Sequence, residues 1–168
     1  MKSLIILLVA MCISFNSCSG RPQEVTSLEF SEIEEVFTQT SDSALGYCDV
    51  TSYFSLTYFS DIDGVIACKI YKSNDSVNFD EFGIFEFESK QDAEKGQKIV
   101  KRYIENAKNE FMNGIVYNPE EYPKFQAADT LVCDKYLIYG ILAPDHIGLV
   151  FKSINQKAKG ALYEVNPI

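Results

Sequence analysis

Two carboxylates stand two positions apart in the run FGIFEFE, at Glu86 and Glu88. In a β-strand this spacing places both side chains on one face. Paired carboxylates can act as general acid and general base in a hydrolytic reaction. The simpler interpretation, which we favour, is that both glutamates lie on the solvent face of the strand. The sequence therefore offers a carboxylate-based hydrolase as an alternative function, and it predicts no catalytic residue.

Two other motifs resemble catalytic or metal-binding patterns only in part. His146 is the single histidine, and because no G-x-S-x-G motif accompanies it, we expect a surface or capping role. Asp61-Ile62-Asp63-Gly64 resembles the start of a calcium-binding loop. However, Val65 and Lys72 occupy the fifth and twelfth positions, where that loop needs oxygen ligands. A turn entering a strand is the expected structure there, and the sequence predicts no metal or cofactor site.

Aromatic residues crowd the irregular segment YCDVTSYFSLTYF. Its rings are those of Tyr47, Tyr53, Phe54, Tyr58 and Phe59. Tyrosine suits a binding surface, because its ring is apolar and its hydroxyl forms hydrogen bonds. The segment is therefore the predicted ligand surface. The alternative interpretation is that these rings close one end of the hydrophobic core.

The N-terminus has the pattern of a secretory signal peptide. Lys2 supplies a positive charge, and an almost unbroken apolar run follows from Leu4 to Phe15. Such a run has the length of a signal-peptide core, whereas a transmembrane helix needs about 20 apolar residues.

The end of the leader, FNSC, resembles a bacterial lipobox, in which an apolar residue, a small residue and then Gly, Ala or Ser precede a lipidated cysteine. Phe15 and Ser17 fit this pattern before Cys18, and the polar Asn16 departs from it. We expect lipidation at Cys18, with plain secretion as the alternative. The expected organisation is a signal peptide over residues 1–17, a lipidated tether over 18–27 and one domain over 28–168.

Composition excludes some partners. The chain is acidic, with a formal net charge of −9, and it has no dense basic patch. Nucleic acid is therefore an unsuitable partner, and the covalent lipid would have to supply membrane attachment. Cys48, Cys68 and Cys133 lack C-x-x-C spacing. They are expected to be small buried side chains, or one disulfide joins two of them.

The remaining periodicity predicts helices and strands in alternating groups. A helix of about eight residues is expected from Ser31, followed by a loop with one or two helical turns and by strands over 64–71 and 82–88. Next come a helix from Ser89 to Gly114 and a short helix opened by Pro119 and closed before Pro123. Two strands within 130–142 that turn at Asp134-Lys135, and a helix from Pro144 to Gly160, complete the expected order.

The segment from Ser89 gives the clearest helical pattern. Ser89 with Asp92 is a plausible N-terminal cap, and the apolar positions recur at helical spacing. We expect the face of this helix to be buried at Val100, Tyr103, Ala107 and Phe111. Two antiparallel hairpins flanked by such helices predict an α+β fold, a two-layer sandwich with an antiparallel sheet of about four strands covered by helices.

Several of these segments together resemble a known family. They are GVIACKIY, FGIFEFES, QDAEKGQKIVKRYIENAKNEF and NPEEYPKFQAADTLVCDKYLIYGIL, within residues 31–156. In these the chain resembles the small lipoproteins of Gram-positive bacteria that form domain-of-unknown-function family 4358. The resemblance implies a lipoprotein location and this fold. It implies no activity and no catalytic residue.

Taken together, the sequence predicts a non-enzymatic binding or interaction module, held by lipid on the outer face of the bacterial cytoplasmic membrane. Its expected partners are the membrane, through the anchor, and an envelope protein or small ligand. A pocket with two or more converging carboxylates would favour the hydrolase, and a shallow surface would favour the binding module.

Overall fold

The computed structural model describes residues 28–40, 46–113 and 118–163. Its elements are α1 (Phe30–Thr40), β1 (Tyr47–Asp49), α2 (Thr51–Thr57), β2 (Val65–Ser73), β3 (Glu81–Phe87), α3 (Lys90–Met112), the 3₁₀ turn η1 (Pro119–Glu121), α4 (Tyr122–Ala127), β4 (Asp129–Cys133), β5 (Tyr136–Ile141) and α5 (Pro144–Tyr163). The predicted signal peptide, Cys18 and the tether lie outside the described residues. Within the described ranges, no helix has the length and apolar character needed to cross a bilayer.

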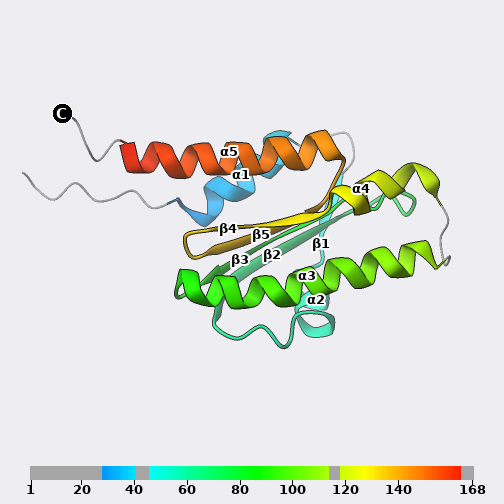
Figure 1. The fold of residues 1–168 in the computed structure, drawn as a ribbon, viewed down its shortest axis with the longest axis horizontal. Helices are drawn as coiled ribbons and strands as arrows, with labels where there is room; N and C mark the ends of the chain where they lie inside the picture. The colour runs from blue at the N-terminus through cyan, green and yellow to red at the C-terminus, as the bar shows by residue number, and fades with distance from the viewer. Residues whose placement is uncertain (1–27, 41–45, 114–117, 164–168) are drawn as a thin grey trace, which may run out of the picture.

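The strands form one antiparallel sheet in the order β1-β2-β3-β5-β4 (Figure 1). The two predicted hairpins are β2–β3 and β4–β5, and pairing of β3 with β5 joins them into one sheet. The fifth strand, β1, lies in the segment that was expected to be a loop with helical turns. Its three residues are too few for an alternating pattern to reveal it.

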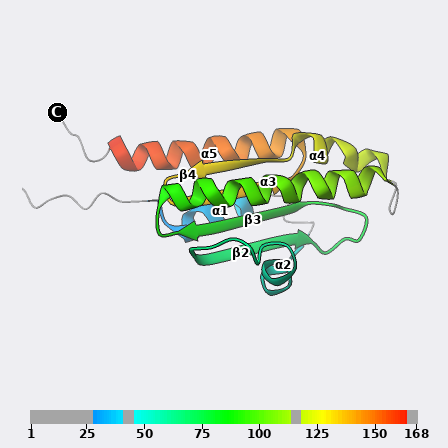
Figure 2. The ribbon, with the colours of Figure 1, turned by 60° about the horizontal axis from the view of Figure 1, so that its bottom comes forward.

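Helices cover both faces of the sheet, which gives three layers where two were expected (Figures 1 and 2). One core contains side chains of α1 and α5 against the sheet, and the other contains side chains of α3 and of the α2 region. The α+β class and the antiparallel sheet are confirmed. The third layer arises because α1 and α5 both bury their apolar stripes on the same face.

The central strand β3 is covered on both sides. The sequence predicts a solvent face for this strand, from the alternation of phenylalanine and glutamate, and that prediction is wrong. Phe82 and Ile84 share a face with Glu86 by the period of two, and both are buried. Phe37 of α1 stacks on Phe82 with ring centroids 4.1 Å apart. The glutamates near the end of the strand suggested a polar face, although Phe82 and Ile84 make the same face apolar at its start.

Helix α3 begins as predicted, because the Ser89 hydroxyl accepts a hydrogen bond from the Asp92 backbone N–H. Val100 and Phe111 are buried, as expected. Tyr103 and Ala107, also expected to be buried, are half-buried. They line a pocket, which explains the difference.

Three helix boundaries differ from those predicted. Helix α1 begins at Phe30 rather than Ser31, and the Glu32 carboxylate accepts a hydrogen bond from the Glu29 N–H at that end. Helix α4 contains Pro123 instead of ending before it, because Pro123 occupies its first turn, where no backbone N–H is needed. Helix α5 starts at Pro144, as predicted, and runs past Gly160 to Tyr163. A glycine lowers helix stability without obliging the helix to end.

Candidate functional site

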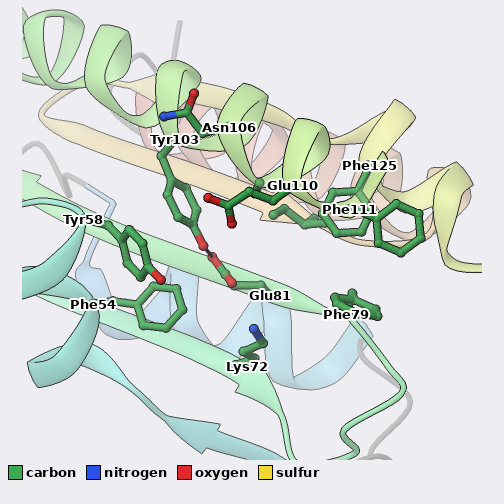
Figure 3. Close-up of a pocket in the computed structure, with 12 residues that line it drawn as sticks. Phe54, Tyr58, Lys72, Phe79, Glu81, Tyr103, Asn106, Glu110, Phe111 and Phe125 are labelled. Atoms are coloured by element: carbon green, nitrogen blue, oxygen red, sulfur yellow. Dashed lines mark hydrogen bonds between the residues drawn. The ribbon is translucent and has the colours of Figure 1, made fainter. Parts of the chain in front are cut away.

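The α3 side of the sheet contains a pocket of about 300 Å³ (Figure 3). Protein pockets for small ligands measure about 300–1,000 Å³, so this one suits a small molecule. The side chains that line it come from α2, β2, β3, α3, α4, β5 and the loops beside them. They are Phe54, Tyr58, Lys72, Phe79, Glu81, Tyr103, Asn106, Ala107, Glu110, Phe111, Phe125 and Ile141.

Helix α3 supplies one wall of the pocket. Tyr103, Ala107 and Phe111 recur every four residues and therefore share one face of the helix. Asn106 and Glu110 lie beside them on exposed positions and form the rim (Figure 3). The wall is thus apolar inside and polar at the mouth.

Four of the five predicted binding aromatics gather at this end of the domain. Phe54 and Phe59 are buried, whereas Tyr53 and Tyr58 are 62% and 43% exposed. The ring centroid of Tyr103 lies 5.1 Å from that of Tyr58 and 4.9 Å from that of Phe59. Phe54 and Tyr58 line the pocket, and Phe59 belongs to the core beneath it.

Tyr47, the fifth predicted residue, is not part of this group. Its ring packs on Phe82, with centroids 5.4 Å apart, in the core on the opposite face of the sheet. Its hydroxyl donates a hydrogen bond to Asp80 Oδ2 at 3.2 Å. The strand β1 turns this side chain away from α2, although the two are close in sequence.

A buried carboxylate forms the floor of the pocket. Glu81 is the first residue of β3 and is only 3% exposed. Its Oε1 accepts one hydrogen bond from the Tyr103 hydroxyl and one from the Tyr139 hydroxyl, both 2.8 Å long. No described residue donates a hydrogen bond to Oε2. Oε2 is not fully buried, and Glu81 is one of the residues that line the pocket.

The surroundings of Glu81 perturb its ionisation. Burial raises the pKa of its carboxyl, while the hydrogen bonds from Tyr103 and Tyr139 and the charge of Lys72 oppose that rise. Burial and the neighbouring Glu81 charge raise the pKa of Tyr103 and of Tyr139. Both tyrosines therefore stay protonated and act as donors. Such perturbed groups in a cleft are typical of functional sites.

Lys72 brings a positive charge to the same pocket. It lies directly opposite Glu81 in the pairing of β2 with β3. Its Nζ lies 5.9 Å from the centre of the Phe54 ring and points toward Glu81 in Figure 3. The described residues give Lys72 no ion pair. Among the described residues that line the pocket, Lys72 is the one lysine and Glu81 and Glu110 are the two carboxylates.

The two glutamates singled out in the sequence do not line this pocket. Glu86 Oε1 is 2.6 Å from Lys135 Nζ, in an ion pair between β3 and the turn that precedes β5. Glu88 follows the end of β3 and is exposed. The described carboxylates that do share a cavity are Glu81, which is buried, and Glu110, which is exposed.

A network of charges holds the pocket wall beside Phe79. Lys124 Nζ lies 2.6 Å from Asp80 Oδ1 and 2.8 Å from Glu121 Oε2. The same Glu121 oxygen accepts a hydrogen bond from the Phe79 backbone N–H at 2.8 Å. The network thereby ties the β2–β3 loop to η1 and α4, next to Phe79 and Phe125, whose side chains line the pocket.

His146 lies near this network and is half-buried, in the first turn of α5. Burial is the main cause that lowers the pKa of His146, with Asp80 raising it and Lys124 lowering it further. The predicted surface position is therefore only partly correct.

The described cysteines Cys48, Cys68 and Cys133 are all free thiols in half-buried positions. The alternative disulfide between two of them is absent from the structure. Among the described residues, no group of three His, Cys, Asp or Glu side chains comes together to hold a metal ion. Gly64 has a φ of 76°, and it follows the exposed Asp61 and Asp63 in the expected turn before β2.

Sequence reasoning missed Glu81, Lys72 and Glu110. Glu81 stands just before FGIFEFE, where it resembles an ordinary polar residue at the start of a strand. Its two hydrogen-bond donors are 22 and 58 positions away. The sequence shows only that a glutamate stands next to aromatic residues. That Tyr103 and Tyr139 bind Glu81 becomes evident only in the folded protein.

The fold and the pocket define a small α+β domain in which one face of the sheet, the α3 side, holds an aromatic pocket with a buried glutamate. The chain belongs to the family described as Domain of unknown function (DUF4358), whose model matches residues 57–142. The resemblance noted in the sequence is thereby confirmed, over a shorter range than expected. The match covers every pocket-lining residue except Phe54. No curated protein and no solved structure matches the chain.

Proposed function

We propose that this chain is an extracytoplasmic lipoprotein, anchored through Cys18 to the outer face of the cytoplasmic membrane, and that its domain is a non-enzymatic module binding a small ligand. The leader pattern before Cys18 supports the anchor. The pocket on the α3 side supports the binding role, because six of its lining residues are aromatic and only one of its two carboxylates, Glu81, is buried, whereas Glu110 is exposed.

One observation carries the binding proposal. Glu81 is buried and lines an aromatic cavity, yet none of the described residues donates a hydrogen bond to its Oε2. Burying a carboxylate is unfavourable, and an apolar residue would fill a purely structural position at lower cost. A ligand that donates a hydrogen bond to this oxygen would account for a carboxylate buried at the pocket.

The pocket can be tested with a neutral aromatic probe. We expect 2-phenylethanol to shift the backbone NMR signals of Tyr103 and Asn106 in the full-length protein. Ala107→Leu places a larger side chain in the cavity and should abolish the shifts, because Ala107 lines the pocket. Ala143→Leu, at an exposed position, is the matched control and should leave them unchanged. Equal shifts in both variants would exclude this pocket as the site.

The anchor can be tested separately. Wild-type protein made in a bacterial host with lipoprotein processing should partition into the detergent phase, and Cys18→Ala should move to the aqueous phase. Cys48→Ala controls for the loss of a cysteine as such. An unchanged partition of Cys18→Ala would contradict lipidation at that residue.

A second candidate function is a hydrolase of envelope material. One observation favours it: Glu81 and Glu110 line the same pocket, and burial raises the pKa of Glu81, as in a general acid. Incubation with purified cell-wall fragments, followed by mass spectrometry, separates the two. Products that disappear with both Glu81→Gln and Glu110→Gln would establish hydrolysis, and fragments recovered intact would favour the binding module.

A further inference from the structure

The ligand chemistry that suits this pocket rests on the proposed binding function. We propose that the pocket selects a small monocation, in which an ammonium group is joined to an aromatic or aliphatic body. Three features of the pocket support this ligand: the open oxygen of Glu81, the charges around it and the aromatic rings of the wall.

The hydrogen bonds of Glu81 leave one position for a donor. The Tyr103 and Tyr139 hydroxyls both donate to Oε1, and no described residue donates to Oε2. A ligand group next to Oε2 must therefore donate a hydrogen bond if this oxygen is to be satisfied. An ammonium group supplies both that donor and the charge that complements the carboxylate, and charge-assisted bonds of this kind are the stronger ones.

The charges that face the pocket favour a cation. Glu81 on β3 and Glu110 on α3 carry two carboxylates, and Lys72 on β2 carries one positive charge. With both glutamates ionised, the balance is one negative charge, which a monocation neutralises. An anionic ligand would be repelled by two carboxylates and attracted by one lysine, whose charge already interacts with Glu81.

The aromatic walls suit the same ligand. Phe54 and Tyr58 have ring centroids 5.0 Å apart, and Tyr58 and Tyr103 have theirs 5.1 Å apart, on the side of the pocket next to Glu81 (Figure 3). Aromatic faces attract ammonium groups, most strongly where water is excluded. Phe79, Phe111 and Phe125 form an apolar cluster at the other end, with Phe111 and Phe125 stacked 4.6 Å apart. This end would accept the body of the ligand.

The test compares three probes with one body and different head groups: 2-phenylethylamine, 2-phenylethanol and 3-phenylpropionate. Calorimetric titration of the full-length protein at neutral pH should give the amine about tenfold higher affinity than the alcohol, and the carboxylate the lowest affinity. Glu81→Gln should remove about tenfold of the amine affinity and leave alcohol binding nearly unchanged.

Two variants make the result specific. Glu110→Gln should weaken amine binding less than Glu81→Gln does, because Glu110 is exposed and its charge is screened. Glu86→Gln is the matched control outside the pocket and should have no effect. Lys72→Met should raise amine affinity and lower carboxylate affinity, and it tests the charge balance even where Glu81→Gln does not fold.

The outcomes separate the ligand class from the binding function. Alcohol or carboxylate binding as tightly as the amine would overturn the monocation and leave the pocket as a binding site. If folded Glu81→Gln and Lys72→Met both bind the amine as tightly as the wild type does, the monocation is likewise overturned and the pocket remains a binding site. Failure of all three probes to bind would contradict the proposed binding function itself.

Discussion

Gly83 and Tyr139 lie directly opposite each other in the pairing of β3 with β5, and the Tyr139 ring occupies the space that a Gly83 side chain would need. A β-carbon on Gly83 would overlap Tyr139 Cε1. With the ring in this place, its hydroxyl reaches Glu81 Oε1, two residues before Gly83 on the same strand face. The glycine therefore makes the buried hydrogen bond at the pocket floor possible.

Gly83→Ala should destabilise the domain. The added methyl group collides with a fully buried ring, and overpacking of this kind costs about 1–3 kcal/mol of the unfolding free energy. Urea denaturation measures the loss. Gly148→Ala is the control, because a β-carbon there meets nothing within 4 Å and alanine is the better helix former. Equal effects of the two substitutions would contradict the steric account.

Glu81 should make the stability of the domain depend on pH. Burial raises its pKa in the folded protein above the ordinary value of 4.5, so the folded state binds this proton more tightly than the unfolded state. The unfolding free energy should therefore rise as the pH falls through the folded-state pKa, with the gain complete below 4.5.

The contribution of Glu81 is isolated by subtracting the unfolding free energy of Glu81→Gln from that of the wild type at each pH. The other titrating groups largely cancel in this difference. We expect the difference to move in favour of the wild type as the pH is lowered. A difference that is flat, or that moves the other way, would show that the folded protein does not raise this pKa.

Lys124→Met should be strongly destabilising. The Lys124 side chain is 14% exposed and neutralises Asp80 and Glu121, which are 9% and 13% exposed. Removing one partner from a buried ionic group costs about 3–5 kcal/mol, because the remaining charges stay buried. Thermal or urea unfolding measures the change. Lys69→Met breaks the solvent-exposed pair with Asp49 and should change stability little.

Phe111→Ala should cost about 3–5 kcal/mol of unfolding free energy, as expected for a core aromatic ring. Phe111 is 6% exposed and stacks on Phe125. Its neighbour Met112 is 55% exposed, and Met112→Ala should change stability by less than about 0.5 kcal/mol. A loss below about 1 kcal/mol for Phe111→Ala would mean that α3 presents a different face to the core.

The sequence was most informative where structure depends on near neighbours. The Ser89 cap, the apolar face of α3 and both hairpins follow from residues a few positions apart, and each was predictable. The start of α5 at Pro144 belongs with them. These features need no knowledge of tertiary contacts.

Tertiary contacts decide the features that the sequence did not reveal. The apolar side of β3 at Phe82 and Ile84 is covered by α1, which lies far from it in the chain. The role of Glu81 depends on Tyr103 and Tyr139, from two other elements. Four aromatic rings of the segment 47–59 do pack together, but the short strand β1 directs the fifth, Tyr47, to the opposite face of the sheet.

The strand order also bears on how copies of this domain meet each other. The outermost strands, β1 and β4, are three and five residues long, whereas the interior strands β2, β3 and β5 have nine, seven and six residues. An outer strand exposes unpaired backbone groups to which a second chain can add a strand, and short outer strands offer few of them. The longer strands lie between other strands, so edge-to-edge pairing between the sheets of neighbouring molecules is disfavoured.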